Sequence, residues 1–335
     1  MRDEGVDVAS ATAAMTELVE AERVDGVIGP VSSRVSFGLV RTLSNRRIPL
    51  CSPTASAFNL DTGLDASYFF RTVPSTKLEA LALGRSIAST GRRTASILYP
   101  DDEFGRLYAA SLGDGLRRNG TEVAAAVPYS PASNDFKDVV ARIVGNDVPD
   151  AVAVVALPET GGRLLGALRD MGAGPTRLPT FVSDAMRQPG LYAAIPDGRP
   201  GSVEGIAGVS ANPNAIKTAW IDAFVASTSQ PPGAYAPYAY DCVMLVALSV
   251  IAADTDRGSA IRDAMIATSR GGTTCTAFAL CAALLSQGLN IDYDGASGPV
   301  DLTSTGDVDS GYFDRYTFDD SGRDVSADAP VLIRL

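Results

Sequence analysis

The sequence predicts an α/β protein built from two doubly wound lobes. Near-continuous apolar segments such as AVAVVAL (151–157) alternate with amphipathic helical patterns, which is typical of parallel strands covered on both faces. Two such runs, 24–60 and 94–183, are separated by the proline-containing segment FFRTVPS (69–75). We expect that segment to be an exposed crossing between the lobes.

The first run is predicted to alternate helix and strand twice. Apolar residues recur at helical spacing over 8–19 and are followed by a strand at 24–30. A helix at 32–45 has one apolar face, and the next strand, 47–52, ends at a turn into 53–60.

The same alternation continues through the rest of the chain. The second run is predicted to contain strands at 94–100, 121–129, 150–158 and 178–183 and helices at 77–89, 104–118, 134–145 and 159–172. A further crossing is expected near 204–213, then helices at 216–226 and 240–253, and short strands in the tail from Asn290.

The amino-acid composition excludes several classes of function. Of 335 residues, 39 are acidic and 28 are basic, giving a net charge of −11, and this balance argues against nucleic acid or an anionic membrane as partner. The chain has no histidine, so mechanisms that need imidazole are excluded. It also has no GxSxG or GxxxxGK[ST] motif. We expect no enzyme and no cofactor, and we expect the apolar segment 242–253 to be a buried helix.

The four cysteines allow two interpretations. Cys275 and Cys281 lie six residues apart in GGTTCTAFALC, and we expect them to form a short-loop disulfide, which implies an oxidising compartment. The alternative is that they are two small buried hydrophobes. Cys51 and Cys242 are predicted to be buried thiols. No CxxC pair occurs, so no metal site is predicted, and the C-terminal aspartates 292, 294, 301, 307 and 309 are expected in turns.

Two strand-to-helix turns carry hydroxyl groups in the first run. In GPVSSR (29–34) Ser33 is either a simple helix cap or part of an anion site built from free N–H groups. In SPTAS (52–56) Thr54, Ala55 and Ser56 follow the next strand. Because successive parallel strands end at one edge of a sheet, the two turns together could hold a small carboxylate.

The second run has its own strand-end residues. Phe104 is either packed in the core or exposed as a pocket wall, and Ala156 and Leu157 lie at the end of the strand at 150–158. Asp184 follows FVS, where it is either an exposed turn residue or a carboxylate that could hold an ammonium group.

Six segments follow one another along nearly the whole chain: DGVIGPVSS, IPLCSPTAS, FFRTVPS, SILYPDDEFGR, the helix after YAYDCVMLVAL, and IDYDGASGPVDLTSTGD. This order resembles the type I periplasmic binding proteins, in the branch that includes the leucine/isoleucine/valine-binding proteins of ABC importers. The resemblance implies two Rossmann-like lobes, 1–74 plus 211–307 and 75–210 plus 308–335. They would be joined by three hinge crossovers and would close on a ligand in the cleft between them.

The resemblance also implies roles for single residues. Ser33 and Ser56 match hydroxyls that hold the ligand carboxylate, Thr54 matches a main-chain contact, and Tyr235 matches an aromatic lining residue. Phe104 and Ala156 stand where the family often has aromatic residues, tyrosine in the first case, and Asp184 is the candidate for its ammonium-binding acid.

We therefore expect a solute-binding protein that captures an amino acid, branched-chain or similar, and delivers it to an ABC permease. The alternative is a ligand-sensing receptor domain of the same fold that binds an amide or an amino acid.

The N-terminal lobe is expected to be incomplete. The family begins with a β-α-β unit of roughly 30 residues or more before the turn that MRDEG resembles, and this chain starts at that turn. A mis-assigned start or a truncated gene would explain this and the lack of an export signal. The intact protein is expected to be periplasmic or at the cell surface.

Overall fold

The computed structural model describes residues 1–5, 7–61, 68–145, 147–188, 191, 206–211 (backbone only), 219–319, 323–326 and 329–335. The chain divides into two compact units. Unit 1 comprises Met1–Ser75, Pro213–Gly311 and Arg334–Leu335, and unit 2 comprises Thr76–Asn212 and Tyr312–Ile333. Each unit combines helices with a sheet, so the predicted α/β architecture is confirmed.

Unit 1 holds two small sheets. One has the order β1-β2-β3 with parallel pairing, and in the other β10 pairs with β9 in parallel and with β11 antiparallel. Its elements are α1 (Val8–Thr16), which continues as a π-helical turn (Glu17–Ala21), β1 (Val27–Ile28), α2 (Ser33–Asn45), β2 (Leu50–Ser52), a 3-10 turn (Phe58–Leu60), β3 (Phe69–Arg71), α8 (Ala219–Thr228), α9 (Ala236–Ala253), α10 (Gly258–Thr268), β9 (Thr273–Cys275), α11 (Phe278–Ser286), β10 (Ile291–Gly295) and β11 (Gly298–Pro299).

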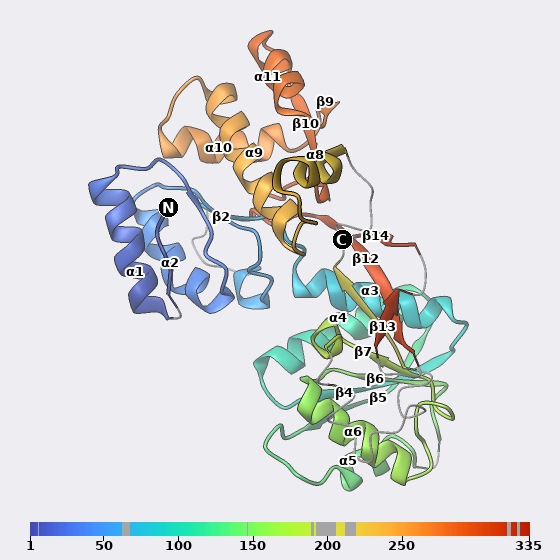
Figure 1. Cartoon of the computed structure of the whole chain (residues 1–335). Coiled ribbons are helices and arrows are strands. Elements are labelled where there is room, and N and C mark those ends of the chain that lie inside the picture. The colour runs from blue at the N-terminus through green and yellow to red at the C-terminus, as the bar shows by residue number, and fades with distance from the viewer. Residues whose placement is uncertain are drawn as a thin grey trace. The chain divides into compact units, whose positions relative to one another are not determined.

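The first sheet of unit 1 is covered on both faces. Side chains alternate along a strand, so Leu50 and Phe69 join the core beneath α1 and α2. Their neighbours Cys51 and Phe70 join the core formed with α9 and α10. Helices α1 and α2 lie side by side, as Figure 1 shows. Burial of both faces explains why these strands are apolar without alternation in the sequence.

Unit 2 is a doubly wound layer structure. Its sheet has the order β13-β12-β8-β7-β6-β4-β5, with β14 paired to β12; pairing is parallel from β8 to β5 and antiparallel at β8–β12 and β12–β13. The elements are α3 (Thr76–Ser89), β4 (Thr94–Pro100), α4 (Glu103–Arg118), β5 (Glu122–Tyr129), α5 (Lys137–Ala141), β6 (Ala151–Val154), α6 (Pro158–Asp170), β7 (Thr180–Val182), a 3-10 turn (Asp184–Met186), β8 (Ile206–Ala211), β12 (Ser310–Phe318), β13 (Asp324–Ser326) and β14 (Val331–Arg334).

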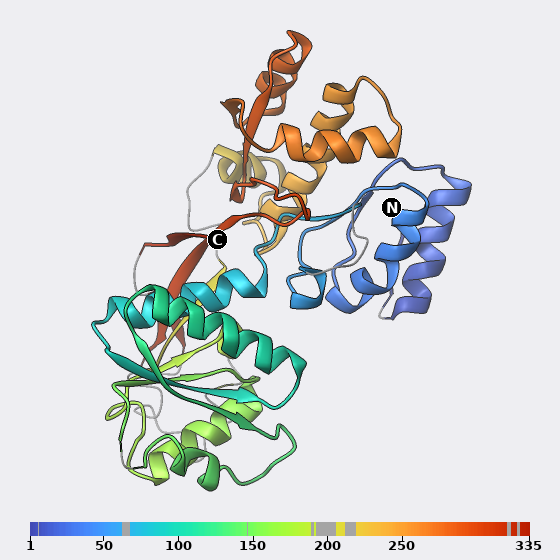
Figure 2. The same ribbon diagram turned by 180° about the vertical axis from the view of Figure 1, so that it is seen from behind.

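Helices cover both faces of the unit 2 sheet. Figure 2 shows α3 and α4 together on one face and α5 and α6 on the other. Two glycines let α3 and α4 pack closely: a Cβ atom on Gly84 would lie 2.7 Å from the carbonyl carbon of Gly115. Only a residue without a side chain fits at such a backbone contact.

The expected exposure of the segment 69–75 is wrong. Every residue of it is buried, and Phe69–Arg71 forms β3, hydrogen-bonded to β2. The segment was expected to be exposed because it contains a proline and separates two runs, whereas its charged residue, Arg71, is paired with acidic residues inside unit 1. The second predicted crossing (204–213) and the start of the predicted helix 216–226 lie partly outside the described residues.

The structure contains two disulfides. One joins Cys275 and Cys281, the pairing that the sequence favoured over two buried thiols. The other joins Cys51 on β2 to Cys242 on α9, so the prediction that these two are free thiols is wrong. Their separation of 191 residues hid the pairing, since only packing of α9 on the sheet brings them together.

Helix α9 is long and apolar enough to cross a membrane by length and composition alone. Its side chains Cys242, Leu245 and Leu248 are buried in the core of unit 1, and Cys242 is bonded to Cys51. These contacts are those of a core helix, as sequence analysis expected for 242–253.

Candidate functional site

The two hydroxyl-bearing turns of unit 1 lie together at the carboxyl ends of β1 and β2. The strands pair in parallel, with Ile28 opposite Cys51, so both chains leave the sheet at the same edge. Ser32, not Ser33, caps α2 by accepting a hydrogen bond from the N–H of Val35. Ser33 is thereby left to contact the neighbouring turn.

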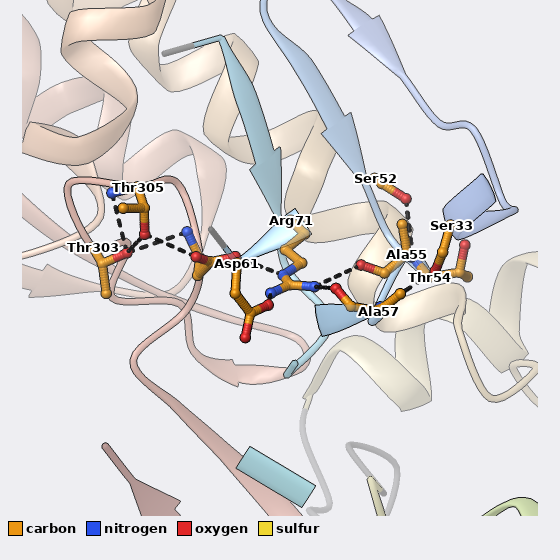
Figure 3. Close-up of polar contacts among 10 residues, drawn as sticks. Ser33, Ser52, Thr54, Ala55, Ala57, Asp61, Arg71, Thr303 and Thr305 are labelled. Atoms are coloured by element: carbon orange, nitrogen blue, oxygen red, sulfur yellow. Dashed lines mark hydrogen bonds and ion pairs between the residues drawn. The ribbon is translucent and has the colours of Figure 1, made fainter. Parts of the chain in front are cut away.

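Three hydrogen bonds join these turns. The Ser52 hydroxyl donates to the carbonyl of Pro30 (2.7 Å), the Thr54 hydroxyl donates to the carbonyl of Val31 (2.6 Å), and Ser33 Oγ accepts from the N–H of Ala57 (3.3 Å). Figure 3 shows Ser33 beside the turn that carries Thr54, Ala55 and Ala57. We call residues 52–57 the binding loop.

The binding loop combines a fixed backbone with accessible hydroxyls. Ala55 is fully buried, whereas Ser33, Thr54 and Ser56 are half-buried. One N–H at this edge is already used, because the carboxylate of Glu4 accepts from the N–H of Val31 at 2.9 Å. Hydroxyl groups at the ends of parallel strands suit a small ligand with a carboxylate, since such groups can donate to its oxygens.

The predicted residues of unit 2 also lie at one sheet edge. Strands β4, β6 and β7 are parallel neighbours, and Phe104, Leu157 and Asp184 follow them in that order. Phe104 and Leu157 are exposed (44% and 69%), whereas Ala156 is buried (6%). Exposure excludes core packing for Phe104, whose ring contacts that of Tyr108 with centroids 5.8 Å apart.

A buried carboxyl supports the position of Asp184. Glu79 on α3 accepts hydrogen bonds from the Tyr108 hydroxyl (2.6 Å) and from the N–H of Asp184 (3.1 Å). Burial, and secondly the charge of Asp184, raise the pKa of the Glu79 carboxyl well above its usual range. Through its bond to the N–H, Glu79 fixes the Asp184 backbone. The sequence alone did not reveal this role, because Glu79 lies inside an apolar helical pattern.

Tyr235 precedes α9 and is exposed (53%), and its ring lies 6.3 Å from that of Tyr238. Further along α9, the buried Asp241 accepts four hydrogen bonds, from Tyr293, Ala296 and, twice, Ser297. These bonds join α9 to β10 and the turn after it, and they account for the YAYD and IDYDGASG motifs as structural contacts.

Sequence analysis also missed Arg71. Its side chain is fully buried and donates from Nη1 to the carbonyls of Ala55 (3.0 Å) and Ala57 (3.2 Å). Asp61 and Asp307 form ion pairs with it, the latter at 2.7 Å from Nε. Figure 3 shows Arg71 between the binding loop and Asp61. Asp307 is thus an ion-pair partner and not only the turn residue that was expected.

Among the described residues, cavities away from these side chains include one in each unit. The one in unit 1, of about 440 Å³, is lined by Trp220, Tyr240 and Phe278 among others. The one in unit 2, of about 250 Å³, is lined by side chains of α3, β12 and β14, Arg85 and Arg315 among them.

The amino-acid sequence is similar to a known protein family and to individual proteins. A family model for periplasmic binding proteins matches residues 1–303. The chemotactic signal transduction system substrate-binding protein BasB of Halobacterium salinarum is 26% identical over 324 residues, which cover 93% of this chain and 74% of BasB. Glutamate receptor 2.7 of Arabidopsis thaliana is 24% identical over 94% of this chain; the match covers 34% of the receptor, so the chain spans about a third of its length.

Solved structures agree on the fold. The branched-chain amino acid transporter substrate-binding protein LivJ from Streptococcus pneumoniae, in complex with isoleucine, superposes with a TM-score of 0.64 at 18% identity. The match covers 100% of this chain and 86% of LivJ. At this identity the likeness shows the fold alone, and it confirms the predicted fold class.

Proposed function

The chain belongs to the periplasmic binding protein family, whose model matches residues 1–303, and from that premise we propose that it captures an amino acid, branched-chain or similar, and delivers it to an ABC importer. The family consists of binding proteins and not of enzymes. Family membership implies a location outside the cytoplasm, and the two disulfides accord with an oxidising compartment.

The observation that carries the proposal is the joined pair of turns in unit 1. Ser33 Oγ and the binding loop meet at the carboxyl ends of two parallel strands, where this class of fold binds ligands. In the proposal Ser33 and Ser56 hold the ligand carboxylate, and Thr54 offers a main-chain contact. Ala55 supports the loop from within, because its N–H donates to Ser52 and its carbonyl accepts from Arg71. Tyr235 is an aromatic wall.

Unit 2 supplies the other contacts in this proposal. Asp184 holds the ammonium group, while Phe104, Ala156 and Leu157 bound the side chain of the ligand. Capture by hinge closure is the motion proposed for such proteins.

A second function has support from one comparison. BasB is named for chemotactic signal transduction and matches 93% of this chain. We therefore keep, as the alternative, a sensor that binds the same class of ligand and signals to a partner protein. A neighbouring permease gene would favour delivery, and a neighbouring signalling gene would favour sensing.

A thermal-shift panel tests ligand binding. The twenty amino acids, short amides and urea are each added at millimolar concentration to the full chain. A ligand at about 1,000 times its Kd stabilises the folded state by roughly 4 kcal/mol, which corresponds to a rise in Tm of several degrees. We expect a shift with one class of amino acid, and a cooperative melt with no shift would contradict the proposal.

Three serine variants locate the ligand. Ser33→Ala and Ser56→Ala should each reduce the shift, because each removes one proposed donor to the carboxylate. Ser286→Ala, on the exposed face of α11 in the same unit, should leave the shift unchanged. An unchanged shift in both site variants would place the ligand elsewhere.

A further inference from the structure

Arg71 is a charged residue in a position where an isolated charge is unfavourable. Its side chain has no exposure to solvent, and on β3 it follows Phe69 and Phe70, which pack into the two cores of unit 1. Burial of a charge is tolerated only when partners compensate for it. The identity of those partners indicates what the residue does.

Two of the partners belong to the binding loop. The carbonyls of Ala55 and Ala57, which accept from Nη1 at 3.0 and 3.2 Å, are on either side of Ser56. A single guanidinium nitrogen therefore fixes the peptide groups around the serine proposed to bind the ligand. The opposite side of the loop is fixed by Ser33 Oγ and Ser52 Oγ.

The other partners are acidic. Asp61 pairs with Nη2 and Asp307 lies 2.7 Å from Nε. Asp307 in turn accepts from the Thr305 hydroxyl at 2.8 Å, and the N–H of Arg71 donates to the carbonyl of Gly306 at 3.0 Å. Figure 3 shows Thr303 and Thr305 on the far side of Arg71 from the binding loop.

These contacts reach two points where the chain leaves unit 1. Arg71 is four residues before Ser75, the last residue of the first segment of unit 1, and Asp307 is four residues before Gly311, the last residue of the second. One guanidinium thus connects the binding loop to the two segments that lead into unit 2. A planar group with several donors in fixed directions can do this, and the single ammonium of lysine cannot.

We propose that Arg71 is a positioning residue, which holds the binding loop in its ligand-accepting conformation and connects it to the segments 69–75 and 303–311. The effect on ligand binding rests on the proposed function above, whereas the effect on the loop itself does not.

Hydrogen–deuterium exchange on the full chain without ligand tests the positioning role. Arg71→Lys keeps the positive charge and removes the guanidinium that donates to the carbonyls of both Ala55 and Ala57. We expect the amides of Ala55 and Ala57 to exchange at least tenfold faster in this variant, with helix α9 unchanged. Equal protection of the loop in a folded Arg71→Lys protein would overturn the proposal.

A matched control separates positioning from general destabilisation. Leu43→Ala creates a cavity in the core under α2 and removes none of the hydrogen-bond or ion-pair partners of Arg71. It should lower Tm at least as much as Arg71→Lys. When each variant is measured at the same number of degrees below its own Tm, the loop amides of Leu43→Ala should exchange as slowly as those of the wild-type protein. If Arg71→Lys does not fold, Asp307→Asn keeps Arg71, removes one ion pair and should accelerate the same amides to a smaller extent; unchanged amides there would equally overturn the proposal.

The amino-acid panel is then applied to the same variants. If an amino acid stabilises the wild-type protein, that shift should fall in Arg71→Lys and persist in Leu43→Ala; a shift kept in Arg71→Lys would contradict the effect on binding. If no amino acid stabilises the wild-type protein, the proposed function fails, and the exchange data still decide whether Arg71 positions the loop.

Discussion

Glu79 is a carboxyl group held almost entirely out of water, with two donors on one oxygen. The hydroxyl of Tyr108 on α4 and the N–H of Asp184 after β7 both donate to it. Burial raises the pKa of Glu79 from its usual value of 4.5, so the folded state keeps a proton that the unfolded state releases. Stability due to this group is therefore complete below about pH 4.5 and is lost as the pH rises towards the folded-state pKa.

Glu79→Gln should remove this dependence on pH. Glutamine is neutral and keeps a carbonyl that accepts from Tyr108 and Asp184. Above about pH 4.5 the free energy of unfolding of the variant should rise relative to that of the wild-type protein by about 1.4 kcal/mol per pH unit, until Glu79 ionises in the folded state. Urea unfolding at pH 5, 6 and 7 measures this, with Glu79→Ala as the variant that loses both hydrogen bonds. Parallel pH profiles for the wild-type and glutamine proteins would show that Glu79 is ionised.

Residues differ in how far the sequence alone reveals them. Ser33 and Ser56 could be proposed because each follows a strand end, which is a local pattern. Arg71 and Glu79 could not, because their roles depend on Asp307 and Asp184, which are distant in the chain. Whether Ser33 and Ser56 contact a ligand stays a prediction.

The packing of α3 against α4 depends on glycine at the crossing of two elements. At Gly84 an added methyl group would meet the backbone of Gly115 and Leu116, which cannot rotate away. At Gly113, on the other side of α4, the nearest atom would be the flexible end of Arg117 at 3.1 Å. The same substitution therefore has opposite consequences on the two faces.

Gly84→Ala should destabilise unit 2 by about 1–3 kcal/mol, because the helices must move apart. Gly113→Ala should be neutral or slightly stabilising, since alanine favours the helix by up to about 1 kcal/mol. Chemical unfolding of both variants measures the difference. Equal effects of the two substitutions would mean that the crossing adapts without cost.

Elements were predictable where the spacing of apolar residues follows the period of a helix or a strand. The segments predicted at 94–100 and 104–118 correspond to β4 (Thr94–Pro100) and α4 (Glu103–Arg118) within one residue, because periodicity reports burial directly. The segment 69–75 is buried throughout and was nevertheless misjudged, because the burial of Arg71 depends on partners elsewhere in the chain. A buried arginine looks like a surface residue until its ion-pair partners are known.

At the scale of the whole molecule, the two disulfides close loops of very different size. Cys51 and Cys242 are 191 residues apart and Cys275 and Cys281 are six apart. In the chain-entropy description the longer loop stabilises the folded state by about 5 kcal/mol and the shorter by about 2 kcal/mol. All four cysteines are buried, so replacing either pair leaves comparable cavities.

Replacement of both cysteines by alanine tests this ranking. Cys51→Ala with Cys242→Ala should lower the free energy of unfolding more than Cys275→Ala with Cys281→Ala. Urea unfolding of the two double variants without reductant measures the difference. A larger loss for the short-loop pair would show that local strain or packing outweighs loop entropy.

The Cys51–Cys242 bond also determines what happens to a protein whose backbone is broken. Residues 76–212, the larger part of unit 2, lie between these two cysteines. A protease that cuts anywhere in that stretch opens the loop but releases no fragment, because both halves remain attached through sulfur. Outside the cytoplasm, where peptidases act and reductants are scarce, a nicked copy would keep its two pieces together.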